Sequence, residues 1–230
     1  MDIINYDIYK SEGHKHHFLL PNSIRMVICG GSGCGKTNLI VNFLLNKGWL
    51  NYDQLFIYTN TQYQEKYNLV RNFFDSIKKQ CGKNILKFLS PQDEIIDPKQ
   101  LDPKMNNVIV FDDCMQDKQT IMSEYFTQGR HNNCDSFYLT QSYFHIPKHT
   151  IRDNANFIII FRQDKKSLQA LYDSHACSDM EFPEFLELAS TSTNDKHGFL
   201  CIDLTSESEN GKYRKGLKTF YLPKKFINRI

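Results

Sequence analysis

The sequence predicts an α/β fold, in which a mostly parallel sheet is flanked by helices and a β-hairpin follows near the C-terminus. Short apolar runs of strand length alternate with amphipathic segments of helical spacing, which is the pattern of a parallel sheet with crossover helices. The apolar run Phe157–Phe161 is strand length and far below the ~20 residues that span a bilayer. Asn210-Gly211, between two late strand-like segments, indicates a hairpin connection.

The expected strands and helices alternate along the chain. Parallel strands are expected at Met26–Cys29, Leu55–Tyr58, Val108–Phe111, Phe137–Thr140 and Phe157–Phe161. A first helix is expected over Lys36–Lys47, and Gly48 would end it. A second helix is expected from apolar residues at helical spacing, which are Tyr63, Tyr67, Val70, Phe74 and Ile77. Two further helices are expected around Ile121–Phe126 and over Lys165–Asp173. The hairpin strands are expected at Phe199–Leu204 and Tyr213–Leu222.

One domain over residues 18–230, including a basic hairpin at about 198–222, is the simplest division of the chain. Residues 1–17 are expected to form a loosely packed N-terminal arm. The arm contains His14, His16 and His17 but no second set of ligands, so a solvated segment is favoured over a metal site.

Composition narrows the class of protein. The chain has 230 residues, 40% of them hydrophobic, which is enough for a substantial core. Its formal net charge of +2 excludes a globally basic coat, so a polyanion would have to meet a local patch. Seven cysteines without a CxxC spacing, and no cleavable signal sequence, predict a reducing, intracellular location and no membrane partner.

Residues Gly30–Thr37 (GGSGCGKT) match the P-loop pattern in full. The first six residues of the motif would turn backbone N–H groups toward phosphate oxygens, at the positive end of the following helix. These residues are Gly30, Gly31, Ser32, Gly33, Cys34 and Gly35. Lys36 would reach the β- and γ-phosphates as the only side-chain cation in the phosphate cradle, and the Thr37 hydroxyl would bind Mg²⁺. The motif therefore predicts an ATP site.

A second motif, Asn107–Asp113 (NVIVFDD), delivers two carboxylates at the end of an apolar strand. Asp112 would hold the magnesium shell, and Asp113 would polarise the attacking water as a general base. The alternative role for Asp113 is the N-cap of the next helix.

Gln141 directly follows the strand Phe137–Thr140. A glutamine there can hydrogen-bond the γ-phosphate or the attacking water. The alternative is an ordinary polar strand end.

Arg130 and Arg152 are candidates for an arginine finger, which stabilises charge on the transferring phosphoryl group from a neighbouring subunit. The sequence places Arg130, in the loop before the Gln141 strand, slightly ahead of Arg152. Surface ion pairs are the alternative role for both.

The segment Lys212–Ile230 holds seven basic residues and no acidic ones, interleaved with aromatic side chains. This composition is compatible with contact to a nucleic-acid backbone. A solvated edge strand, whose charges discourage pairing with another sheet, is the alternative.

With these motifs placed, the chain resembles viral genome-packaging ATPases of the FtsK–HerA superfamily, of the poxvirus type found in virophages, Polinton (Maverick) elements and large DNA viruses. The similarity runs from about Phe18 to Leu204. It rests on Arg25–Leu39, Asn107–Asp113, Glu124–Pro147 and Ile151–Asn154. The GRH, TQS and IRDN elements at this spacing are far more specific than the P-loop itself.

The resemblance implies a RecA-like P-loop NTPase fold of the ASCE type, with the strand before Gln141 between the P-loop strand and the Asp112 strand. It implies a ring homo-oligomer, a pentamer or hexamer, with ATP at each interface, double-stranded DNA through the centre, and a capsid protein as a further partner. It assigns Gly30–Thr37 to ATP, Asp112 to Mg²⁺, Asp113 to catalysis, Gln141 to sensing the γ-phosphate, and an arginine to action in trans. The implied location is the host cytoplasm or viral factory, or the virion. Many members have glutamate where this chain has Asp113, which reaches about one methylene less.

Four functions remain open at this point. The first is a motor that packages DNA into a capsid. The second is a related translocase or helicase of replication or segregation, which the short chain without an appended DNA-processing domain disfavours. The third is an ATP-binding capsid-assembly subunit with little turnover, which the complete Asp112, Asp113 and Gln141 set disfavours. A P-loop kinase is the fourth, but no lid or acceptor pocket can be located in the sequence.

Overall fold

A computed structural model describes residues 13–90, 93–117 and 119–227. Within this part of the chain, one sheet has the strand order β3-β2-β4-β5-β1-β6-β7-β8-β9. The strands are β1 (Arg25–Cys29), β2 (Gln54–Thr59), β3 (Leu86–Leu89), β4 (Asn107–Asp112), β5 (Cys134–Thr140), β6 (Phe157–Ile160), β7 (Leu200–Asp203), β8 (Tyr213–Lys215) and β9 (Thr219–Tyr221). Strands β1 to β6 pair in parallel and β7 to β9 are antiparallel, which confirms the predicted fold class.

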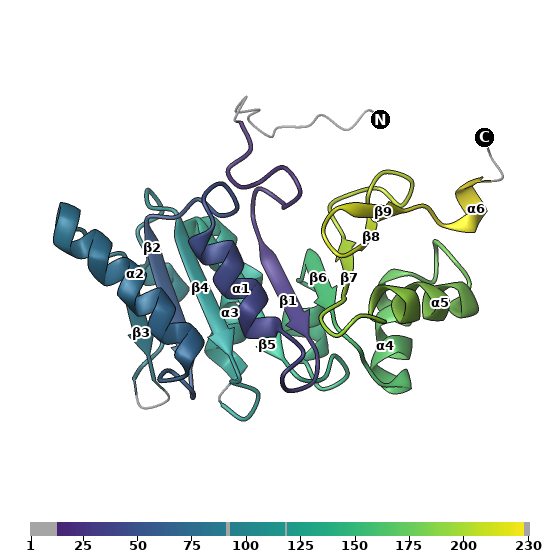
Figure 1. Ribbon diagram of the computed structural model, residues 1–230, viewed down its shortest axis with the longest axis horizontal. Helices are drawn as coiled ribbons and strands as arrows, with labels where there is room; N and C mark the ends of the chain where they lie inside the picture. Colours follow the sequence, from purple (N-terminus) through teal and green to yellow (C-terminus); the bar gives the residue numbers. More distant parts are fainter. Residues whose placement is uncertain (1–12, 91–92, 118, 228–230) are drawn as a thin grey trace, which may run out of the picture.

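Helices cover both faces of the sheet (Figure 1). The α-helices are α1 (Lys36–Leu45), α2 (Glu65–Cys81), α3 (Gln119–Gln128), α4 (Lys165–His175), α5 (Phe182–Ser192) and the short α6 (Lys224–Ile227). Single turns occur at Pro98–Gln100, Gly129–Asn132 and Lys148–Arg152. Helices α1 and α2 pack on one face and α3, α4 and α5 on the other, so the chain folds as three layers.

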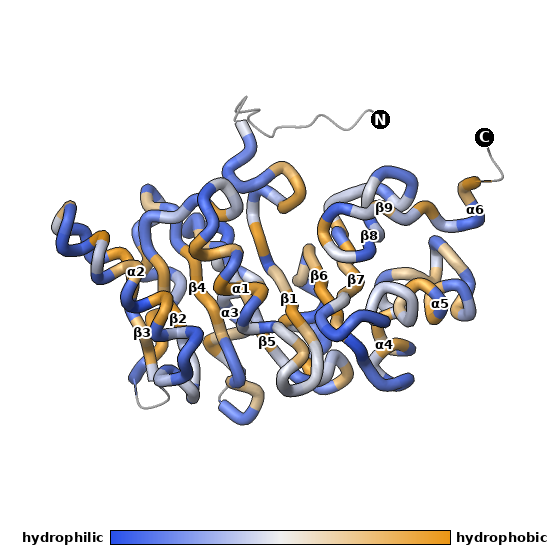
Figure 2. The backbone as a smooth tube through the Cα atoms, viewed as in Figure 1, coloured by the Kyte–Doolittle hydropathy of each residue, from blue (hydrophilic) through white to orange (hydrophobic). Residues whose placement is uncertain are grey.

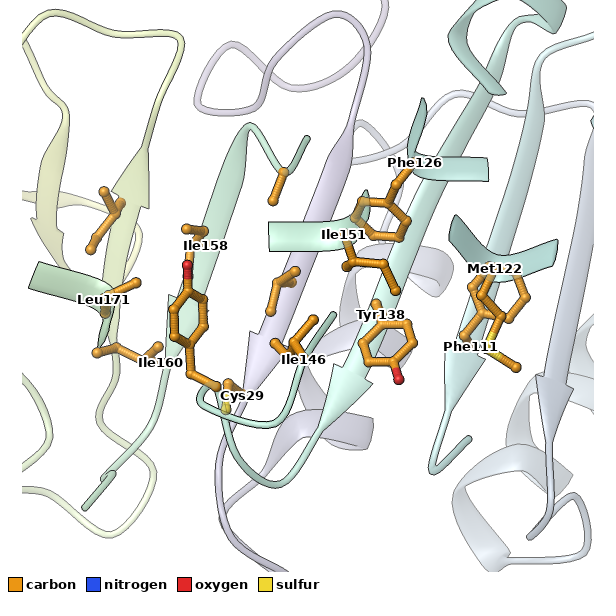
Figure 3. Close-up of a cluster of buried hydrophobic side chains, with 14 of the residues drawn as sticks. Cys29, Phe111, Met122, Phe126, Tyr138, Ile146, Ile151, Ile158, Ile160 and Leu171 are labelled. Carbon is orange, nitrogen blue, oxygen red and sulfur yellow. The ribbon is translucent and has the colours of Figure 1, made fainter. Parts of the chain in front are cut away.

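The alternation of side chains along each strand feeds two hydrophobic clusters, one per face. Val27 and Cys29 of β1 point to the α3 face, whereas Met26 and Ile28 point to the α1 face. In Figure 2 the strands of the sheet are largely hydrophobic, and the helices beside them mix hydrophobic and hydrophilic residues. Figure 3 shows the α3-side cluster, in which Phe126 and Ile151 pack near Tyr138.

Strand β5 lies between β1 and β4, as the resemblance implies. The register pairs Cys29 with Thr140 and Asp112 with Leu139, so these three parallel strands end level with one another. The P-loop, the Asp112–Asp113 pair and Gln141 therefore emerge at one edge of the sheet, the lower edge in Figure 1.

Three expectations need correction. The single strand expected over Tyr213–Leu222 is two short strands, β8 and β9, because Gly216 adopts a left-handed φ of 65° and turns the chain between them. Helix α1 ends at Leu45 with Asn46 as its cap, and Gly48 lies in the turn beyond. Strand β3 and helix α5 were not expected.

Residues 15–17 are packed and not loose, whereas Gly13 and His14 are exposed. His16 is buried and its Nε2 lies 3.0 Å from Asp135 Oδ2, while Lys15 Nζ donates to the same oxygen at 2.8 Å. His17 stacks on Trp49 with ring centroids 4.1 Å apart. Buried Asp135, at the start of β5, holds this segment against the sheet because its charge needs partners. Residues 1–12 lie outside the described residues, and the domain division stays a prediction.

Candidate active site

The P-loop connects β1 to α1 and is tied to the neighbouring strand. Gly30 N donates to Thr140 O at 3.0 Å. A Cβ at Gly30 would lie 2.6 Å from Cys34 Sγ and 2.7 Å from Phe161 Cβ, and Gly35 has a φ of 120°. Glycine is therefore required at both positions, for close approach at one and for the backbone conformation at the other.

The loop and the strand ends enclose a small polar cavity of about 190 Å³. Its lining residues are Ser32, Gly33, Lys36, Thr37, Thr61, Gln64, Lys66, Asp112, Asp113, Leu139, Thr140 and Gln141. Lys36 Nζ donates to Gly30 O at 2.5 Å and to Gly31 O at 3.0 Å, which places its charge inside the loop. Lys66, at the start of α2, is a second cation of this cavity, whereas within the P-loop itself, Gly30–Thr37, Lys36 is the only cation.

Asp112 lies at the floor of the cavity, where two hydroxyl groups meet one of its oxygens. Thr37 Oγ1 donates to Asp112 Oδ2 at 3.1 Å, and the Tyr67 hydroxyl donates to the same atom at 2.6 Å. Burial raises the pKa of Asp112, while the bonds from Tyr67 and Thr37 and the charge of Lys36 oppose that shift. Tyr67 was expected only as an apolar helix position, and its polar role could not be seen without the fold.

The pair of Thr37 and Asp112 fits a magnesium ion. A hydroxyl and a carboxylate side by side are the hard oxygen ligands that Mg²⁺ takes from a protein, alongside phosphate oxygens. The described residues contain no cluster of three or more His, Cys, Asp or Glu that could hold a metal by itself. The site therefore suits an ion that keeps most of its ligands from the nucleotide and water.

Asp113 is exposed and projects from the strand end in an unusual backbone conformation. Its φ is 59°, in the left-handed region that aspartate tolerates better than most residues. Asn60 Nδ2 donates to Asp113 O at 3.1 Å and supports this turn. Helix α3 begins only at Gln119, so the alternative role of Asp113 as its N-cap is excluded. The carboxylate is free to face the cavity.

Gln141 is exposed directly after β5 and its backbone is held by Gln163. Gln163 Nε2 donates to Gln141 O at 3.3 Å, and its Oε1 accepts from Tyr143 N at 3.3 Å and from Cys29 Sγ at 3.2 Å. One amide thus joins the end of β1 to the turn that carries Gln141. This clamp comes from the segment after β6, and no local pattern in the sequence predicts it.

A second cavity of about 700 Å³ adjoins the first, and Asp113 and Gln141 line both. Its other lining residues include Asn60, Gln116 and His145. Asp113, the predicted base, and Gln141, the predicted sensor, therefore lie where the P-loop cavity adjoins the wider second cavity.

The two arginine candidates lie away from this cavity. Arg130 precedes β5, so it lies at the opposite edge of the sheet, and it is exposed. Arg152 is half-buried with its guanidinium 5.4 Å from the centre of the Tyr143 ring. Neither arginine lines the P-loop cavity of its own subunit. Arg162, exposed directly after β6 at the P-loop edge, is a further cation that the sequence motifs did not indicate.

Half of the described basic residues in the segment after residue 211 form ion pairs within the chain. Lys212 Nζ lies 2.5 Å from Asp179 Oδ2, buried Arg214 lies 2.6 Å from Asp203 Oδ2, and Lys224 Nζ lies 3.4 Å from Glu187 Oε2. The acidic partners come from other parts of the sequence, which explains why the segment alone looked uncompensated. This favours the alternative of a structural edge over a nucleic-acid contact; Arg229 lies outside the described residues.

Among the described helices, none has the length and apolar character needed to cross a membrane. Residues 12–212 match the family model described as Poxvirus A32 protein. Among curated protein sequences, none matches the chain.

Solved structures with the same fold include the genome packaging NTPase B204 from Sulfolobus turreted icosahedral virus 2 in complex with AMP. The two sequences are 12% identical, and the match covers 80% of this chain and 94% of that chain with a TM-score of 0.52. The same protein in complex with AMPPCP gives 14% identity, 80% and 93% coverage and a TM-score of 0.50. B204, the DNA-packaging ATPase from Sulfolobus turreted icosahedral virus, gives 14% identity, 78% and 92% coverage and a TM-score of 0.54. These likenesses establish the P-loop NTPase fold.

Proposed function

The chain belongs to the Poxvirus A32 protein family, and we propose that it is an ATPase that drives double-stranded DNA into a viral capsid. The observation that carries the proposal is the junction of the two cavities, where Asp113 and Gln141 stand beside the Thr37–Asp112 pair. This arrangement provides separate groups for binding phosphates and for activating water. The fold shared with B204, a genome-packaging NTPase, supports the same function.

The triphosphate of ATP binds in the P-loop cavity. Backbone N–H groups of Gly30–Thr37 and the N-terminus of α1 face the phosphate oxygens, and Lys36 and Lys66 add positive charge. Thr37 and Asp112 would hold Mg²⁺, which would neutralise charge on the phosphate oxygens. Tyr67 fixes the orientation of the Asp112 carboxylate through its 2.6 Å bond.

Hydrolysis uses the two residues at the cavity junction. Asp113 accepts a proton from water as the water oxygen bonds to the γ-phosphorus, and the bond from that phosphorus to the leaving ADP oxygen breaks. Gln141 orients the water or the γ-phosphate by hydrogen bonding. The shorter reach of aspartate compared with glutamate suits an exposed Asp113 on a turn that projects it forward.

A ring of subunits, pentameric or hexameric, completes the proposal. An arginine finger from the adjacent subunit would neutralise charge on the γ-phosphate. For Arg130 and Arg152 this role stays a prediction, because it requires an adjacent subunit in the ring. DNA passes through the ring, a capsid protein receives it, and the assembly works in the host cytoplasm or viral factory or on the virion.

ATP turnover measured with and without long duplex DNA tests the proposed function. We expect DNA to raise turnover, with little dependence on its sequence and a clear decline as salt increases, because a motor must use phosphate contacts. The Asp113→Asn protein serves as the control for contaminating ATPases. Turnover that ignores DNA at low salt would favour the capsid-assembly subunit instead.

A further inference from the structure

The edge of the sheet opposite the P-loop carries an open cavity of about 680 Å³. Four separated segments supply its walls: residues 14–25, Arg130 and His131, Asn156, and residues 203–214. In Figure 1 the segment before β1 and the strands β8 and β9 lie toward the upper edge, away from the P-loop.

The charges of this cavity are not balanced. Its charged lining residues are Arg25, Arg130, Arg214 and Asp203. Arg214 and Asp203 neutralise each other, since Arg214 Nη2 lies 2.6 Å from Asp203 Oδ2 and both side chains are buried. Arg25 and Arg130 are left without a carboxylate in the lining.

The two remaining arginines are placed to share an anion. Arg25 Nε donates to Asn154 O at 2.6 Å, which fixes the guanidinium at the start of β1. In the described residues the Arg130 side chain makes no hydrogen bond and no ion pair. Burial lowers the pKa of Arg25 and the nearby charge of Arg130 lowers it further, while the carboxylate of Asp135, which does not line the cavity, partly opposes both. Like charges held together in a walled site are stabilised by an anion between them.

The rest of the lining suits a phosphate. Ser23, Thr205 and Ser206 provide hydroxyl groups, and Asn22 and Asn156 provide amides. Guanidinium groups bind phosphate oxygens through paired N–H donors, and hydroxyls and amides add neutral donors.

We propose that the cavity around Arg25 and Arg130 binds a backbone phosphate of duplex DNA. The proposal rests on the proposed function, which requires a sequence-independent DNA contact, and it replaces the Lys212–Arg229 segment as the place of that contact. The cavity lies at the edge away from the nucleotide, so the two ligands occupy different ends of the same parallel strands.

The test measures binding of a fluorescently labelled duplex across a salt series, with AMPPCP and Mg²⁺ present. Arg130→Gln removes a charge on an exposed side chain and no observed bond, so the fold should be retained. We expect roughly tenfold weaker binding at low salt, and a salt slope that is smaller by about one for each phosphate that the variant no longer neutralises. The duplex affinity of Arg130→Lys should lie between those of the unchanged protein and Arg130→Gln. Lys83 is an exposed lysine after α2, and Lys83→Gln should bind duplex as the unchanged protein does. Arg25→Gln, checked for folding by its thermal unfolding, should bind as weakly as Arg130→Gln.

Binding by Arg130→Gln equal to that of the unchanged protein would overturn this site while leaving the proposed function standing. No salt-sensitive binding by the unchanged protein would overturn both. DNA affinity retained while DNA-free ATP turnover is lost would assign Arg130 to a neighbour's nucleotide phosphate, and so would also overturn the site.

Discussion

The two edges of the parallel sheet differ in how their functional residues are arranged along the chain. At the P-loop edge, each group comes from a short motif at a strand end: Gly30–Thr37, Asp112-Asp113 and Gln141. At the opposite edge, Arg25 and Arg130 line one cavity only because β1 and β5 are neighbours. A motif at the end of a strand can be recognised in the sequence. A site built from residues that precede two different strands cannot, because it forms only if those strands are neighbours in the sheet.

The largest expected effect concerns the P-loop edge. Lys36→Ala should abolish detectable ATP binding and turnover, because Lys36 supplies the charge inside the loop. Lys66→Ala should weaken ATP binding by a smaller factor, on the order of tenfold, because Lys66 only borders the cavity. Titration of ATP into each variant measures both; equal losses would contradict this ranking.

Asp113→Asn should separate binding from chemistry at the same edge. It keeps the shape of the side chain but removes the base, so ATP should still bind while hydrolysis falls on the order of a hundredfold or more. Single-turnover hydrolysis and ATP titration give the two values. Loss of binding equal to that of Lys36→Ala would refute the division of roles.

Gln163 should matter through the position of Gln141. Gln163→Ala removes both bonds to the Gln141–Tyr143 turn, and we expect kcat to fall roughly tenfold with ATP affinity little changed. Gln163→Glu keeps an acceptor for Tyr143 N but cannot donate to Gln141 O, so it should not restore kcat. Full activity of either variant would show that Gln163 does not position Gln141.

An expected effect on stability and not on activity lies outside both edges, at His175. Its Nε2 lies 2.8 Å from the Tyr143 hydroxyl, and burial lowers its pKa to about 4. Because the unfolded imidazole titrates near 6.5, the folded state is at full stability above that pH and loses stability as pH falls toward 4. Between pH 7 and 4.5 the loss should be about 2 kcal/mol.

His175→Gln keeps a polar group and removes this titration, so its unfolding free energy should fall less between the same two pH values. Denaturant unfolding of both proteins gives the difference. Identical pH dependence would show that His175 is not held neutral.

The sequence was sufficient for the fold class and for the groups at the P-loop edge, because periodicity and strand-end motifs are local. Tyr67 shows the limit: its helical spacing predicted a buried face, but its bond to Asp112 spans 45 positions and depends on α2 packing beside β4. The basic segment shows a second limit, since the sequence left both of its alternatives open. Its charges looked free because Asp179, Asp203 and Glu187, which pair with it, lie outside the segment.

The separation of nucleotide and DNA between the two edges is tested most directly by duplex affinity in two variants, measured in one salt series. We predict that Lys36→Ala retains salt-sensitive duplex binding without nucleotide, whereas Arg130→Gln loses most of it although it still binds AMPPCP. Duplex binding lost in Lys36→Ala and retained in Arg130→Gln would contradict this separation.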